Sequence, residues 1–338
     1  MQRISCAVEG AYVATRPRPV PKGNTVFVTI RAVNRCFRFV PNRKTRETIE
    51  YAFFAIAQKY ADRIDIHEYL WMSNHLHIEL TDHKGVLPAF VQDLNSYVAR
   101  ALNAMRGCRG DVFEKDQHSV VRVEHDDAGV EFAVYTLTNP VKANLVAHAD
   151  HWKGLSSLDM EYGDVKVAHR PPHGLWKPGP RGRAGKKAKA SGRDKYMGRS
   201  KFDETVQLRL VRPPIHLELT DEQLRDLIRE RIKAKEQKLK RERKGKVVGW
   251  AKVKAQDFNA SPESSEELFG RKPTVATRSE WAEREAEQRD RAWLEAYYDA
   301  RDRFNDAPDD QKKDIIFPYG TWYMRQRHKV RCHPPPDH

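Results

Sequence analysis

The order of hydrophobic periodicities between residues 25 and 142 most strongly limits the fold of this chain. Four short segments have the composition of half-buried β-strands: residues 25–33, 63–72, 75–81 and 119–123. The spacing of apolar residues predicts three helices: residues 43–62, 87–105 and 127–138. The order strand, helix, strand, strand, helix, strand, helix predicts an α+β fold, a ferredoxin-like antiparallel sheet with helices on one face.

The composition changes after this region. Residues 166–201 contain twelve Lys and Arg against the single Asp194, and this favours a flexible basic linker, acting either as a solvated tether or as a nonspecific phosphate contact. Beyond it, helical patterns follow, the first opening with the capping-box spacing of Thr220 and Gln223, and alternation suggests a last strand over 317–330. We therefore predict four parts: an N-terminal arm (1–24), a sheet domain (25–160), a basic linker (161–201) and a mainly helical extension (202–338).

The charge balance indicates a polyanionic partner. The chain has 61 Lys and Arg against 47 Asp and Glu, a formal net charge of +14. Nucleic acid is the first expectation and an anionic membrane surface the second. There is no apolar run of the roughly 20 residues that a membrane span needs, and no C-x-x-C pair of a zinc ribbon. We expect a cytoplasmic, nucleoid-associated protein with no membrane partner.

The segment WMSNHLHIELT, residues 71–81, contains two histidines on one face of a predicted strand. Side chains alternate along a strand, so His75, His77 and Glu79 share a face and the intervening apolar residues share the other. Neutral imidazoles are good ligands for divalent metals. Two interpretations stay open at this point: a metal-binding pair, or a polar strand face in contact with water, on which Glu79 is expected to be solvated.

A second pair of polar residues lies in the segment VYTLTNPVKANLV, residues 134–146. Tyr135 and Asn139 are four residues apart and therefore share one face of a helix. A tyrosine hydroxyl can act as a nucleophile, and a carboxamide oxygen can complete a metal's ligand set. The alternative is structural, with Tyr135 partly buried and Asn139 capping the helix before Pro140.

The two segments together resemble the HUH-type transposases that act on single-stranded DNA, in particular the REP-associated tyrosine transposases. WMSNHLHIEL is similar to their histidine strand, and YTLTNPVKANLV with HWKGLSS (151–157) is similar to their nucleophile block. VFVTIRAVNR (26–35) and GDVFEKDQHSVVRV (110–123) resemble their first strand and the segment before the nucleophile helix. The resemblance covers about residues 25–158. It departs from the pattern at Ser73, where proline is usual, and at Asn144, where glycine is usual; asparagine also tolerates left-handed backbone.

The resemblance implies that residues 25–160 form a single-strand transposase domain. Tyr135 would attack a phosphodiester of single-stranded or hairpin DNA and form a 5′-phosphotyrosine link, which a second 3′ end would reverse. His75, His77 and Asn139 would hold Mg²⁺ or Mn²⁺. No nucleotide cofactor is expected, because strand transfer conserves the phosphodiester and the sequence has no G-x-x-x-x-G-K-[ST] loop.

Three basic residues near these motifs are candidates for contacts with DNA phosphates: Lys142, Arg31 and Arg35. A noncatalytic, domesticated nucleic-acid-binding protein on the same fold is the main alternative function. An RNA-binding ferredoxin-like module is disfavoured, because the sequence has no K/R-G-F/Y-G-F/Y strand. The sequence leaves open the choice between monomer and homodimer, the DNA sequence recognised, and the role of residues 202–338.

Overall fold

The computed structural model describes residues 17–115, 118–171, 203–262, 275–276 and 280–335. Most of the predicted N-terminal arm and most of the predicted basic linker lie outside the described residues. Every helix within the described ranges is too short or too polar to cross a lipid bilayer.

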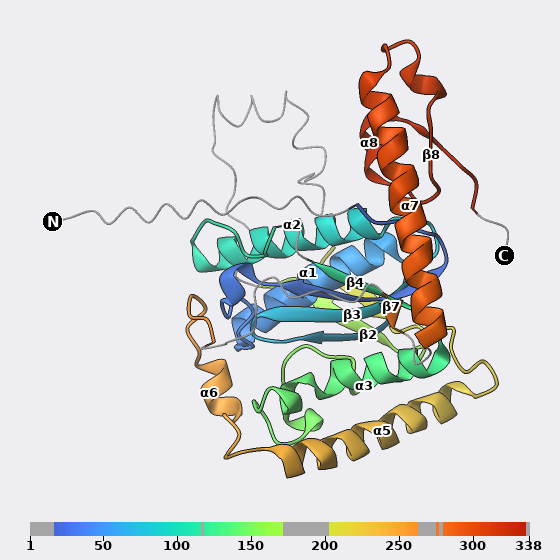
Figure 1. The fold of residues 1–338 in the computed structure, drawn as a ribbon. Coiled ribbons are helices and arrows are strands. Elements are labelled where there is room, and N and C mark those ends of the chain that lie inside the picture. Colours follow the sequence, from blue (N-terminus) through green and yellow to red (C-terminus); the bar gives the residue numbers. More distant parts are fainter. Residues whose placement is uncertain (1–16, 116–117, 172–202, 263–274, 277–279, 336–338) are drawn as a thin grey trace, which may run out of the picture.

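An antiparallel sheet forms the centre of the molecule (Figure 1). Its four main strands are β1 (Asn24–Arg31), β2 (Ile64–Trp71), β3 (His75–Asp82) and β4 (Ser119–Val123). They lie in the order β2-β3-β1-β4, and a two-residue strand, β7 (Val275–Ala276), pairs in parallel with β4 at the edge. This strand order is ferredoxin-like, and the predicted α+β class is confirmed.

The pairing register assigns each side chain to one of two faces. Val28 of β1 lies opposite Ile78 of β3, which lies opposite Tyr69 of β2, so these apolar side chains share a face. Phe53 packs edge to face on Tyr69, with 5.1 Å between ring centroids. Two helices cover this face: α1 (Arg43–Tyr60) and α2 (Leu87–Arg106). The prediction of helices on one face holds for these two.

The third helix, α3 (Asp126–Lys142), lies against the opposite face of the sheet, the face that carries the two histidines (Figure 1). Phe132 of α3 stacks on Phe27 of β1, with 4.5 Å between ring centroids and 11° between planes. Gly129 allows the segment at Ile215, between β6 and α5, to pack closely on α3, because a Cβ there would lie 2.8 Å from the Ile215 side chain. The sheet is therefore covered on both faces, and the histidine face is closed by the helix that carries Tyr135.

Helix α3 runs through Pro140 to Lys142, so the prediction that it ends before the proline is wrong. Proline has no N–H to donate, but the loss is confined to the last turn, and the N–H of Ala143 again donates to the carbonyl of Asn139 at 2.9 Å. Asn144 follows with a φ of 54°, which confirms the expected left-handed residue after the helix.

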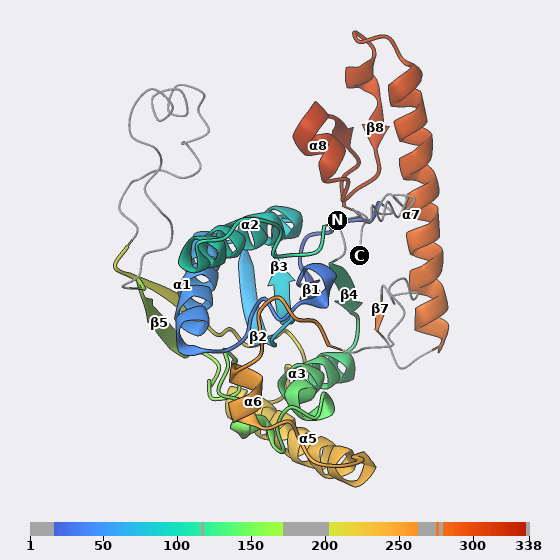
Figure 2. The same cartoon turned by 90° about the vertical axis from the view of Figure 1, so that its left-hand side faces the viewer.

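The described start of the predicted linker forms a strand, and the described chain after the linker packs onto the sheet domain. Strands β5 (Val165–His169) and β6 (Thr205–Arg209) pair with each other, and α5 (Asp221–Glu242) packs along α3 on the side away from the sheet (Figure 2). Thr220 and Gln223 form the predicted capping box. Buried residues of α5 belong to the same hydrophobic core as the sheet: Leu224, Ile228 and Ile232. The predicted boundaries at residues 160 and 202 stay predictions.

The C-terminal residues form a smaller cluster beside α7 (Glu280–Asp306). Short elements complete it: β8 (Ile316–Phe317), α8 (Tyr323–His328) and β9 (Arg331–Cys332). The predicted strand over 317–330 is therefore wrong. Met324, in α8, and Val330, beyond its end, both pack in this second core with Phe304.

Candidate functional site

The two histidines of β3 lie side by side beneath α3. The ring centroids of His75 and His77 are 4.6 Å apart, with the rings nearly perpendicular. Strand pairing sets Arg31 of β1 opposite His75 and Thr29 opposite His77. His77 is 3% exposed and His75 is half-buried. The interpretation of the pair as an ordinary solvated strand face is therefore wrong for His77.

Hydrogen bonds fix the tautomer of both imidazoles. The Asn139 amide nitrogen donates to Nε2 of His77 at 3.0 Å, so Nδ1 of a neutral His77 carries the proton and donates to Thr29 Oγ1 at 3.0 Å. Nδ1 of His75 donates to Asn74 Oδ1 at 2.7 Å. In each ring the Nδ1–H is used by an oxygen, which leaves Nε2 with its lone pair. Metal-binding histidines are oriented by contacts of this kind.

The surroundings keep both rings uncharged near neutral pH. Burial, followed by the charge of Arg31, lowers the pKa of His75 to about 4. Burial also holds the pKa of His77 well below its usual range, with smaller contributions from His75, Arg31 and Lys142. Because a metal competes with a proton for the imidazole lone pair, both rings are ready to act as ligands at neutral pH.

Helix α3 brings the second predicted pair to the same place. Asn139 is 6% exposed and is within the helix, so the helix-cap interpretation is wrong. Its carboxamide contacts His77 and is also hydrogen-bonded to His75, an interaction that raises the His75 pKa and partly opposes burial. Tyr135 lies one turn earlier and packs edge to face on His77, with 5.3 Å between ring centroids. Four side chains from two elements far apart in sequence thus form one cluster.

Basic side chains surround this cluster. The ammonium of Lys142 lies over the Tyr135 ring, 4.8 Å from its centroid. The charge of Arg31 acts on both histidines. Arg35 lies in a turn where its φ is 54°, and its carbonyl accepts a hydrogen bond from the Asn74 amide at 3.3 Å. The cluster therefore combines neutral nitrogen ligands with positive charge, which suits a metal-bound phosphate.

The donor set fits a divalent cation. The Nε2 atoms of His75 and His77 face the carboxamide of Asn139, whose oxygen replaces its nitrogen when the amide rotates by half a turn. Two imidazoles and one amide oxygen leave further positions open for phosphate oxygens. Mg²⁺, Mn²⁺ and other first-row metals all suit such a mixed nitrogen and oxygen set, so the donors do not select one of them.

Glu79, on the same face of β3, is buried and not solvated as expected. It is 0% exposed, so the expectation of a solvated side chain is wrong, and both carboxyl oxygens are buried without a hydrogen-bond partner among the described residues. Burial, and to a lesser extent the charge of Glu68, raises the pKa of Glu79 well above its usual range. Its carboxyl group lies next to Gly129 near the start of α3, about two turns before Tyr135.

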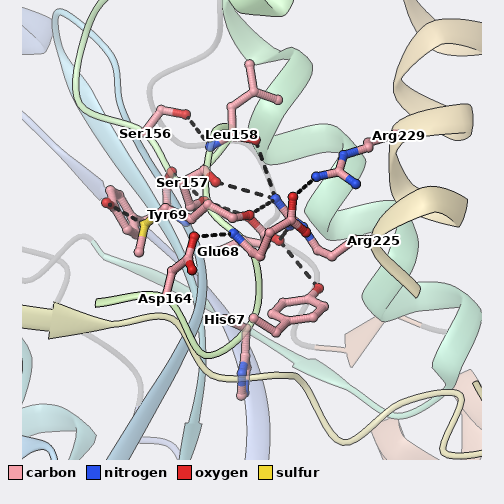
Figure 3. Close-up of polar contacts among 12 residues, drawn as sticks. His67, Glu68, Tyr69, Ser156, Ser157, Leu158, Asp164, Arg225 and Arg229 are labelled. Atoms are coloured by element: carbon pink, nitrogen blue, oxygen red, sulfur yellow. Dashed lines mark hydrogen bonds and ion pairs between the residues drawn. The ribbon is translucent and has the colours of Figure 1, made fainter. Parts of the chain in front are cut away.

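Glu68 of β2, the cross-strand neighbour of Glu79, lies in a closed network (Figure 3). Arg225 of α5 forms a buried ion pair with it and donates a second hydrogen bond, of 2.6 Å, to the carbonyl of Met160. Ser157 donates to the other carboxylate oxygen at 2.5 Å. This network binds α5 to the sheet, and α5 in turn packs on the Tyr135 helix.

A second group of possible metal ligands lies at the start of α3. Ligand atoms of Asp126, His216 and Glu218 lie within 4.8 Å of one another. They are partly or fully exposed and are bonded to one another, with His216 Nδ1 3.0 Å from Glu218 and the His216 backbone N–H donating to Asp126 at 2.9 Å. Asp126 is nine residues before Tyr135, or about 13 Å along the helix axis. This group is therefore separate from the histidine cluster.

Three supporting residues were not identified from the sequence: Thr29, Asn74 and Arg225. Thr29 could have been found from strand pairing, since it lies opposite His77 once the register is known. Asn74 lies inside the histidine motif itself. Arg225 gave no signal, because an arginine in a charged helix is ordinarily solvated, whereas here it is 2% exposed.

Comparison with known proteins gives one match. No protein-family model matches the sequence, and neither does any curated protein. Among solved structures, the chain is similar to one described as a REP-associated tyrosine transposase bound to a REP hairpin. The sequences are 17% identical, the TM-score is 0.35, and the match covers 42% of this chain and 80% of the other.

Proposed function

We propose that this protein cleaves single-stranded DNA and transfers the strand through a covalent phosphotyrosine at Tyr135. The observation that carries the proposal is the contact of one helix with one strand: Tyr135 packs on His77, and Asn139, one turn along, contacts both imidazoles. A nucleophile thereby lies beside a set of neutral metal ligands. The net charge of +14 is what a polyanionic substrate requires.

His75, His77 and Asn139 would hold Mg²⁺ or Mn²⁺. When bound, the cation supplies positive charge to a nonbridging phosphate oxygen. The protein's own residues then set the geometry. Asn74 and Thr29 fix the orientation of the rings, and the helix fixes the nucleophile relative to them. Phosphoryl transfer depends mainly on such positioning and on charge neutralisation.

The covalent step is balanced without a cofactor. The Tyr135 hydroxyl oxygen forms a bond to phosphorus, and the bond from phosphorus to the 3′ oxygen breaks. The phenol loses its proton and the leaving 3′ oxygen gains one. The products are a 5′-phosphotyrosine and a free 3′ hydroxyl, and attack by a second 3′ hydroxyl reverses the step. No ATP or other nucleotide is consumed.

Positive side chains around the cluster would hold the flanking strand. Lys142 lies over Tyr135 and Arg31 lies opposite His75, and we propose that both contact phosphates near the scissile one. Arg35 would make a contact further out. Hairpin-containing DNA is the proposed substrate, in the cytoplasm and associated with the nucleoid; the same chemistry is compatible with a monomer or a homodimer.

The test is a covalent adduct assay. With Mn²⁺ or Mg²⁺ and single-stranded hairpin DNA, the protein should give a band of lower mobility on a denaturing gel. Tyr135→Phe should abolish the band while DNA binding survives, because the phenyl ring keeps the packing on His77 but lacks the oxygen. His77→Ala should lose the band as well. Tyr323→Phe, at an exposed tyrosine of the C-terminal cluster, should keep it.

Two outcomes would change the conclusion. An adduct on the Tyr135→Phe variant would move the nucleophile to another tyrosine. Binding without an adduct across a library of structured single strands, with either metal, would favour the alternative, a noncatalytic nucleic-acid-binding protein on the same fold.

A further inference from the structure

We propose that residues 240–254, here called the basic strap, bind the sugar-phosphate backbone of the single strand that enters the Tyr135 site. The strap is the end of α5, the following loop and α6 (Trp250–Lys254). It contains seven Lys and Arg against the single Glu242. The identity of the polymer rests on the proposed function, and the strap itself lies outside the segments that resemble a known family.

The middle of the strap is attached to the exit of the Tyr135 helix. The N–H groups of Val248 and Gly249 donate to the carbonyls of Asn144 and Leu145, each at 2.9 Å. Asn144 is two residues beyond Lys142, the cation that lies over Tyr135. The strap therefore passes the exit of the helix whose Lys142 lies over Tyr135.

The chain just beyond the strap is attached to the other side of the site. Ala260 accepts a hydrogen bond from the N–H of Phe37 at 2.8 Å, and Arg38 donates to Asn259 at 2.6 Å. Phe37 and Arg38 follow the turn that contains Arg35, the turn bonded to Asn74 and so to His75. Figure 1 shows α6 rising from the end of α5 beside the sheet. The chain thus runs from the nucleophile side of the cluster to the histidine side.

The charges of the strap are available to a ligand. Six of its cations are exposed and, among the residues that the structure describes, form no ion pair: Lys240, Arg241, Lys244, Lys246, Lys252 and Lys254. The first half of α5 differs, since Arg225 and Arg229 are paired with Glu68 and Glu161. The start of α5 is therefore charge-paired with the sheet domain, whereas its last turn and the loop after it carry exposed cations.

The backbone of the strap is held in place, so the cations are presented at fixed positions. Val253 is fully buried, and Trp250 packs edge to face on Trp152 with 5.4 Å between ring centroids. Val253 and Trp250 pack against the protein, and Val248 is an exposed apolar residue of the loop, so the strap does not present the continuous apolar face that a membrane-binding helix requires. A phosphate backbone needs only the exposed charge, and this favours nucleic acid over a membrane surface.

The test measures binding without chemistry, in a Tyr135→Phe background. Lys240→Gln, Arg241→Gln, Lys244→Gln and Lys246→Gln are introduced together, and affinity for a fluorescent single-stranded DNA is measured against salt. For single strands, the slope of log K against log salt should become shallower by roughly 0.7 for each phosphate that the variant no longer neutralises. Affinity at low salt should fall by about tenfold or more. All four positions are exposed, and a thermal melt checks that the variant folds.

The matched control removes four charges from the C-terminal cluster, with Arg325→Gln, Arg327→Gln, Lys329→Gln and Arg331→Gln. Its salt slope should stay near that of the parent. An unchanged slope in the strap variant, or an equal decrease in both variants, would overturn the inference. Binding of the parent to phosphatidylserine vesicles but not to DNA, abolished when the strap charges are removed, would assign the strap to a membrane instead. If the parent binds no DNA at all, the proposed function fails; if it binds and the strap variant binds equally well, only this inference fails.

Discussion

The face of the sheet beneath α3 has two polar ends that differ in one respect. At one end, His75 and His77 keep the lone pairs of their Nε2 atoms directed at a carboxamide that can rotate. At the other end, both carboxylate oxygens of Glu68 are engaged, by Arg225 and by Ser157 (Figure 3). The histidines lie on β3 and Glu68 lies on the neighbouring strand β2, and only Glu68 has its polar atoms fully engaged.

This difference indicates that the Glu68 network has a structural role and that the histidine cluster can bind a ligand. A buried carboxylate whose two oxygens are both engaged has no capacity for a ligand, and the ion pair gives α5 a fixed position. Neutral imidazoles with one nitrogen anchored and the other open can still gain a ligand. Burial alone therefore does not identify the site; the unused lone pair does.

The largest expected effect comes from removing the buried ion pair between Glu68 and Arg225. Arg225→Met leaves Glu68 buried without its cation and should lower the free energy of unfolding by about 3–5 kcal/mol. Urea or guanidinium denaturation measures the change. The double variant with Glu68→Leu removes the orphaned charge and should recover most of the loss. A single variant as stable as the parent would show that the pair is not the attachment of α5.

An effect of intermediate size should come from metal binding at the histidine cluster. At about a hundred times its Kd, Mn²⁺ should raise the free energy of unfolding by about 2.7 kcal/mol. His75→Ala should abolish this gain, whereas Asp126→Asn, in the exposed group at the start of α3, should keep it. Thermal denaturation with and without metal measures both. The reverse pattern would move the metal site to Asp126, His216 and Glu218.

The smallest effect concerns Glu79, which belongs to neither end. Its pKa is raised in the folded protein, so folding retains a proton that the unfolded chain releases above its usual pKa of 4.5. Wild-type stability should therefore fall as the pH rises above 4.5. Glu79→Gln lacks this proton release and should be more stable than the parent near neutral pH, by on the order of 1 kcal/mol. The gain should vanish below pH 4.5; a gain that is independent of pH would show that Glu79 has a hydrogen-bond partner.

The local and the long-range parts of the prediction had different outcomes for a physical reason. Strand and helix periods depend on local spacing, so β1 to β4 and the first two helices lie within a few residues of their predicted bounds. The rule that proline ends a helix failed at Pro140, because one missing N–H is tolerated in a last turn. Alternation also failed over 317–330, where the chain forms α8 and packs Met324 and Val330 in the second core with Phe304.

The sequence by itself determined the order of strands and helices between residues 25 and 142, the shared face of His75 and His77, and the shared helix face of Tyr135 and Asn139, because these follow from periods of two and of about three and a half residues. Only the tertiary structure decided that α3 lies on the histidine face, that Glu79 is buried, and that α5 is held by Arg225. Those outcomes depend on contacts between segments up to 157 residues apart, whose free energy no local pattern records.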